Sequence, residues 1–200
     1  HYHSTTTTDW RYAADQHQIK LDSGETIKAS VLIGADGQRS WVREQLGIPI
    51  EGGIYGQSAI VATIETEHPH AQTARQIFLP TGPLALLPLG DPHRVSIVWS
   101  SEQGFAEGCM QESCEDFSAR LTKAISSWYG QAQLRDERHR FPLGYQHARR
   151  YALHHAAILG DAAHTAHPLA GQGVNMSFLD AAVLAEQLAL AAEGKQAFAA

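Results

Sequence analysis

Residues 160–175 carry the side chains whose types and spacing could do chemistry. They read Gly-Asp-Ala-Ala-His-Thr-Ala-His-Pro-Leu-Ala-Gly-Gln-Gly-Val-Asn. The apolar run before them predicts a buried strand, and the apolar spacing of residues 176–190 predicts a helix after them. Asp161 would then end a strand, where its carboxylate can accept hydrogen bonds from hydroxyls. Two glycines let a backbone approach closely, and a helix N-terminus offers unpaired N–H groups and partial positive charge, so the pattern predicts a polar cofactor.

A second segment, residues 31–40, has a related pattern. It reads Val-Leu-Ile-Gly-Ala-Asp-Gly-Gln-Arg-Ser, which is an apolar strand that ends in Asp36 and Gly37, with Arg39 before a short helix. Each pattern has a purely structural alternative. A type I turn explains Asp-Gly without a ligand, and Asp161 could simply cap a helix.

Taken together and in this order, the two segments resemble the flavin-dependent aromatic hydroxylases (group A flavoprotein monooxygenases). The Gly-Asp pair followed by Ala-Gly-Gln-Gly-x-Asn is most similar to the ubiquinone-biosynthesis branch of that family. The resemblance implies FAD as cofactor, NAD(P)H as co-substrate, and hydroxylation of an aromatic ring with O₂. It also implies that the flavin performs the oxygen chemistry while the protein positions and shields it.

The resemblance assigns cofactor-binding roles to individual positions, whereas no catalytic residue is assigned. Asp161 matches the acidic residue that binds the ribityl chain, and the loop beside the isoalloxazine ring is matched by Pro168, Gly171, Gln172 and Gly173. Val174 and Asn175 follow in the first turn of the helix, where Asn175 either touches the ring edge or caps the helix. Asp36 and Gly37 match a motif that contributes to FAD and NAD(P)H binding, and Arg39 would sit near cofactor phosphates.

The implied fold class is α/β (α+β): a partial FAD-binding Rossmann-like layer with an inserted antiparallel-sheet substrate domain, similar to para-hydroxybenzoate hydroxylase. We expect residues 1–47 and 151–200 to belong to the FAD-binding domain and residues 48–150 to the substrate domain. Short strands divided by turn signals predict the antiparallel sheet. Leu84, Leu86 and Pro88 lie in the segment expected to face the substrate, with core packing as the alternative for each.

Composition excludes some functions. The formal charge of −6 and the absence of a Lys/Arg cluster argue against nucleic-acid binding. Cys109 and Cys114 suit neither a disulfide framework nor a Cys-x-x-Cys motif, so we expect free structural thiols and a cytoplasmic protein. No apolar run was expected to reach the length of a membrane span. His164 and His167 have no partners at metal-ligand spacing, so no metal site is expected.

The Gly-x-Gly-x-x-Gly turn that holds the FAD pyrophosphate in this family has no counterpart in the 200 residues. We therefore expect an internal fragment that is catalytically silent by itself. A polyprenylated phenol or quinol is the expected substrate, which would place the parent enzyme peripherally on the inner membrane or in a biosynthetic complex, with oligomeric state left open. Two alternatives stand beside this interpretation: another flavin enzyme of the superfamily (a halogenase, epoxidase or polyketide hydroxylase), or a remnant that only binds partners.

Overall fold

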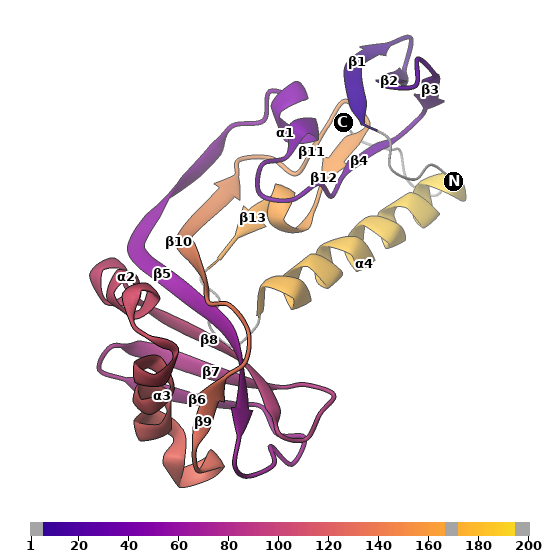
Figure 1. Cartoon of the computed structure of the whole chain (residues 1–200). Coiled ribbons are helices and arrows are strands. Elements are labelled where there is room, and N and C mark those ends of the chain that lie inside the picture. Colours follow the sequence, from indigo (N-terminus) through magenta and orange to yellow (C-terminus); the bar gives the residue numbers. More distant parts are fainter. Residues whose placement is uncertain (1–5, 167–171, 195–200) are drawn as a thin grey trace. The chain divides into compact units, whose positions relative to one another are not determined.

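The computed structural model describes residues 6–166 and 172–194, which form two compact units. One unit comprises residues 1–53 and 145–200, and the other comprises residues 54–144. The elements in chain order are β1 (Thr7–Ala13), β2 (Gln16–Leu21), β3 (Thr26–Ala29), β4 (Leu32–Gly34), α1 (Trp41–Gln45), β5 (Ile50–Thr66), β6 (Arg75–Leu79), β7 (Gly82–Pro88), β8 (Arg94–Glu102), α2 (Gln103–Gln111), α3 (Cys114–Tyr129), β9 (Ala132–Leu134), β10 (His139–Ala148), β11 (Ala152–Leu153), β12 (Ala156–Ile158), the 3₁₀ helix η1 (Gly160–Ala162), β13 (His164–Thr165) and α4 (Gln172–Ala192) (Figure 1).

The first unit contains two small sheets. Strands β1, β2 and β3 form an antiparallel meander, while β12 pairs in parallel with β4 and antiparallel with β11. Residues 26–33 contribute to two strands, because the chain leaves the meander after Ala29 and enters the other sheet at Leu32. Apolar side chains of α1, β4 and β12 pack into one core, including Val42, Leu46 and Ile158.

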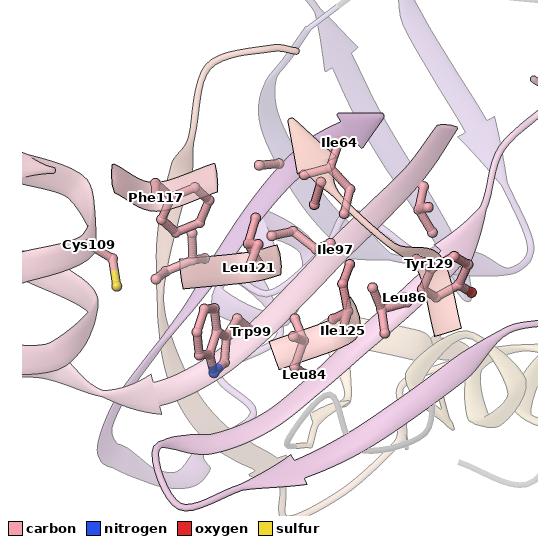
Figure 2. Close-up of a cluster of buried hydrophobic side chains, with 14 of the residues drawn as sticks. Ile64, Leu84, Leu86, Ile97, Trp99, Cys109, Phe117, Leu121, Ile125 and Tyr129 are labelled. Carbon is pink, nitrogen blue, oxygen red and sulfur yellow. The ribbon is translucent and has the colours of Figure 1, made fainter. Parts of the chain in front are cut away.

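The second unit is an antiparallel sheet covered on one face by two helices. The strands run in the order β5, β8, β7, β6, and β9 pairs with the end of β5. Leu84 and Leu86 of β7 are fully buried with Trp99 of β8 and with Phe117 and Leu121 of α3 (Figure 2). These two leucines therefore belong to the core. The mixed α/β class with an antiparallel sheet is confirmed.

Helix α2 and the true extent of α4 were not expected from the sequence. In the described residues, Gly173–Ala192 is long and apolar enough to cross a membrane by length and composition, with a mean hydropathy of 1.2. The expectation concerned an uninterrupted apolar run, and Asp180 and Glu186 divide the apolar residues of this helix. Val174, Phe178 and Leu179 of this helix are largely exposed.

A buried histidine joins the meander to the β11–β12 turn. His17 of β2 is fully buried; Trp10 Nε1 donates to its Nδ1 at 3.1 Å, and its Nε2 lies 3.1 Å from the His155 carbonyl oxygen. Both ring nitrogens are thus used by the neutral tautomer that carries its proton on Nε2. Tyr12, His154 and His155 surround the ring. Burial lowers the pKa of His17, and this effect outweighs the hydrogen bonds to the backbone of His155 and His154, which raise it.

We expect His17 to make stability pH-dependent. A lowered folded-state pKa means that the unfolded chain binds the proton more tightly, so the free energy of unfolding falls as pH drops below the ordinary histidine value of 6.5. His17→Gln, whose amide can accept from Trp10 and donate to His155, should reduce this loss between pH 7.5 and 5.5, as measured by urea unfolding. His139→Gln at an exposed position is the control. An unchanged pH dependence in His17→Gln would contradict the assignment.

Candidate functional site

Asp161 lies at the carboxyl end of a parallel strand, beside a cavity of about 600 Å³. Strand β12 ends at Ile158, and Asp161 occupies the middle of η1 with its side chain exposed. The cavity is lined by Leu159, Asp161 and Thr165 from this segment. From the first two turns of α4 it is lined by Gly173, Val174, Ser177 and Phe178. The structure therefore brings the Gly-Asp turn and the beginning of the following helix to one concave surface.

Two polar groups on this cavity lack partners in the described part of the chain. Thr165 Oγ1 is buried without a hydrogen bond. The Asp161 carboxylate makes no hydrogen bond or ion pair with a described residue. Buried polar atoms are nearly always satisfied in folded proteins, so the unsatisfied Thr165 hydroxyl is an unusual feature of a cavity wall.

The other residues of this segment that were expected to bind the cofactor do not all line the cavity. Gly173 and Val174 line the cavity with Asp161, and Gln172 begins α4. Asn175 is exposed in the first turn of α4 and is not among the lining residues described. Pro168 and Gly171 lie outside the described residues.

The Asp-Gly segment organises the start of α1. Asp36 Oδ1 accepts from Ser40 Oγ at 2.5 Å, and Asp36 Oδ2 accepts from the Val42 backbone N–H at 3.1 Å. Ser40 in turn caps the helix by accepting from the Arg43 N–H. Gly37 adopts a φ of +82°, a left-handed conformation that favours glycine. Arg39 is exposed. The Asp36 carboxylate thus has a structural task, and its cofactor role stays a prediction.

Two residues that the sequence analysis missed hold the two segments together. The buried Arg43 donates from one terminal nitrogen to the Ala162 carbonyl at 2.9 Å and from the other to the Gln38 carbonyl at 3.0 Å. Gln146 Nε2 donates to the Gln38 carbonyl at 3.1 Å and to the Asp161 carbonyl at 2.9 Å. Two side chains from separate elements therefore fix the Asp-Gly loop against the Gly-Asp turn.

Neither residue carried a recognisable signal in the sequence. Arg43 looks like an ordinary charged position on a short helix, and Gln146 like a polar residue of a strand. The one sequence feature that points to Arg43 is the spacing of Asp36, Ser40 and Arg43, in which a serine suited to capping a helix lies between a carboxylate and a cation.

The two cysteines differ in burial. Cys109 is buried in the core of the second unit, where burial raises the pKa of its thiol, and Cys114 is exposed; both are free. Across residues 6–166 and 172–194, no group of three or more His, Cys, Asp or Glu side chains could hold a metal ion.

We expect Arg43→Met to lower the free energy of unfolding by about 2–4 kcal/mol, because two buried carbonyl groups lose charge-assisted hydrogen bonds. Chemical denaturation measures this loss. Arg150→Met removes the same charge from an exposed position of the same unit and should change stability by less than about 0.5 kcal/mol. Equal, small effects of the two substitutions would show that Arg43 does not hold the segments together.

Two proteins of ubiquinone biosynthesis are similar to most of this chain. The ubiquinone hydroxylase UbiL of Rhodospirillum rubrum is 43% identical over 184 residues, which cover 92% of this chain and 43% of that protein. The mitochondrial ubiquinone biosynthesis monooxygenase COQ6 of Danio rerio is 36% identical over an alignment that covers 96% of this chain and 45% of that protein. The chain therefore spans slightly less than half the length of these relatives.

A solved structure and the sequence pattern of one protein family also match this chain. The structure of pqsL, a probable FAD-dependent monooxygenase from Pseudomonas aeruginosa, matches with a TM-score of 0.79 and 29% identity. The match covers 96% of this chain and 55% of that protein. The sequence pattern of the family described as FAD binding domain matches residues 1–198. With nearly the whole sequence matched, the chain belongs to the FAD binding domain family.

Proposed function

We propose that this chain provides part of the FAD site of a flavin-dependent monooxygenase that hydroxylates an aromatic ring in ubiquinone biosynthesis. The observation that carries the proposal is the pairing of the Asp161 carboxylate and the orphaned Thr165 hydroxyl on a cavity beside the beginning of α4. The family assignment and the names of the relatives from Rhodospirillum rubrum and Danio rerio support it.

The residues on the cavity fit the ribityl part of FAD. This polyol needs hydrogen-bond acceptors and donors, which Asp161 and Thr165 offer on the lining of one cavity. Apart from its chain neighbours and its own helix backbone, no atom of the described residues lies within 4 Å of the position that a Cβ on Gly173 would take, so the backbone there is accessible to a flat ring. The cavity volume of about 600 Å³ lies in the range typical of ligand sites.

Bound FAD would supply the redox chemistry by taking electrons from NAD(P)H and reacting with O₂. The chain's own residues would hold and orient it. Asp161 would accept hydrogen bonds from ribityl hydroxyls. The N–H groups at the beginning of α4 would stabilise negative charge on the pyrimidine side of the reduced ring, since a helix N-terminus carries partial positive charge. Pro168, Gly171 and Gln172 would complete the loop beside the ring, and Asn175 would reach its edge or cap the helix.

We assign Asp36, Gly37 and Arg39 to the phosphate and NAD(P)H side of the site. Arg39 is exposed, as a phosphate-binding cation must be before its ligand binds. Asp36 would act mainly by keeping the loop in shape, because both of its carboxylate oxygens already accept hydrogen bonds within the chain.

We assign the second unit to the aromatic substrate, for which a polyprenylated phenol or quinol fits best. The helices cover one face of its sheet, while Val61, Ala85 and Val98 on the other face are half-buried and Leu87 is exposed. An apolar sheet face suits a substrate with a hydrocarbon tail. Such a lipid substrate would bring the complete enzyme to the inner membrane surface as a peripheral protein or into a complex of biosynthetic enzymes.

We expect Asp161→Ala to weaken FAD binding by about 1–3 kcal/mol, because ribityl hydroxyls would lose their charged acceptor. A fluorescence titration of FAD into the complete gene product measures the dissociation constant. Asp136→Ala, at an exposed position of the second unit, is the matched control and should bind like the unmodified protein. If Asp161→Ala binds FAD with unaltered affinity, Asp161 does not contact the cofactor.

We expect Thr165→Val to separate stability from binding. The valine removes an unsatisfied buried hydroxyl at nearly constant shape, so the ligand-free protein should unfold at the same or a higher urea concentration. FAD affinity should nevertheless fall several-fold, by roughly 1 kcal/mol, since the hydroxyl would find its partner on the cofactor. Loss of stability with unchanged FAD affinity would give Thr165 a structural role instead.

A further inference from the structure

One carboxylate oxygen ties α4 to both sides of the Gly-Asp turn. Asp180 Oδ2 accepts from the Gly160 backbone N–H at 2.9 Å and lies 2.6 Å from His164 Nε2. Because an ionised carboxylate only accepts hydrogen bonds, the imidazole nitrogen carries the donated proton. Gly160 and His164 flank Asp161 in the sequence, so a single side chain of the helix secures the segment that presents Asp161.

The helix face that carries Asp180 is the one in contact with this turn. Gly173, Ser177 and Asp180 follow one another at spacings of four and three residues, which places them on one side of an α-helix. A Cβ at Gly160 would come within 3.0 Å of Ser177 Oγ, and Gly160 has a φ of +59°. The turn and the helix are therefore in close contact at Gly160, and Asp180 lies about two turns beyond Gly173.

His164 is held in a fixed orientation as well. Its ring stacks on Tyr151 with 5.8 Å between centroids and 26° between planes, and the residue is buried. Burial raises the pKa of Tyr151, and the charge of Asp180 raises it further, which is consistent with a carboxylate close to this stack. The imidazole is thus fixed by packing on one side and by Asp180 on the other.

We propose that Asp180, with His164, is a positioning residue for the cofactor site. Asp180 is not among the residues that line the cavity with Asp161, Thr165 and Gly173. Instead, it joins the two walls of that cavity, the Gly-Asp turn and the first turns of α4, and so sets their separation. Asp161 then meets the cofactor at a fixed distance from the helix N-terminus. The inference rests on the proposed FAD site and adds the residues that keep this site in register.

The test compares FAD affinity and backbone protection in variants of the complete gene product. Asp180→Asn keeps the size of the side chain and removes its charge, and FAD should bind about tenfold more weakly, because charge-assisted hydrogen bonds are about twice as strong as neutral ones. Hydrogen exchange of the Gly160 amide in the absence of FAD should become faster in the same variant. Glu186→Gln removes one charge from an exposed position of the same helix and should alter neither quantity.

A second pair of variants distinguishes positioning from general stability. His164→Gln keeps an N–H donor for Asp180 and should retain FAD affinity within about threefold, whereas His164→Ala should weaken binding about tenfold, as expected for loss of a hydrogen bond to a charged group. This pair also serves if Asp180→Asn does not fold. If the imidazole merely fills space, His164→Gln should bind FAD as weakly as His164→Ala.

The outcomes separate this inference from the proposed function. FAD affinity in Asp180→Asn and His164→Ala equal to that of the unmodified protein would overturn the positioning role and leave the FAD site standing. Failure of the unmodified protein to bind FAD would remove the proposed function and this inference with it. Weaker binding together with faster Gly160 exchange supports the inference.

Discussion

The candidate site depends on how two loops satisfy their backbone carbonyl groups. The carbonyls of Gln38, Asp161 and Ala162 would each be costly to bury without donors. Arg43 and Gln146 provide four N–H···O contacts to them, and both side chains share the Gln38 carbonyl. Since these donors come from α1 and β10, the Asp-Gly loop and the Gly-Asp turn keep a fixed relation only when both elements are in place.

At the proposed site, some residues hold the two loops in place and others would bind the ligand. Asp36, Arg43, Gln146 and Asp180 use their polar atoms within the chain, whereas Asp161 and Thr165 would use theirs to bind the proposed cofactor. A ligand therefore meets groups that are already oriented, which reduces the entropy lost on binding.

The sequence predicted the parts of this architecture that depend on local pattern. The antiparallel strands, the short helix after Asp36 and the helix after Gly173 follow from alternation, caps and apolar spacing. It did not predict the division of residues 26–33 into two strands, because a run of alternating residues does not reveal when a chain changes sheets. The bonds of Arg43 and Gln146 depend on carbonyl groups brought together by folding, which no local pattern encodes. The burial of Leu84 and Leu86 was not predictable either, since strand alternation does not show which face of the sheet the helices cover.

The most direct measurement of the central claim is an experimental structure of the complete gene product with FAD bound. We expect ribityl hydroxyls to lie within hydrogen-bond distance of the Asp161 carboxylate and the flavin ring to lie beside the beginning of α4. We also expect Thr165 Oγ1 to have gained a partner on the cofactor. FAD bound elsewhere, with Asp161 facing solvent and the cavity empty, would contradict the account.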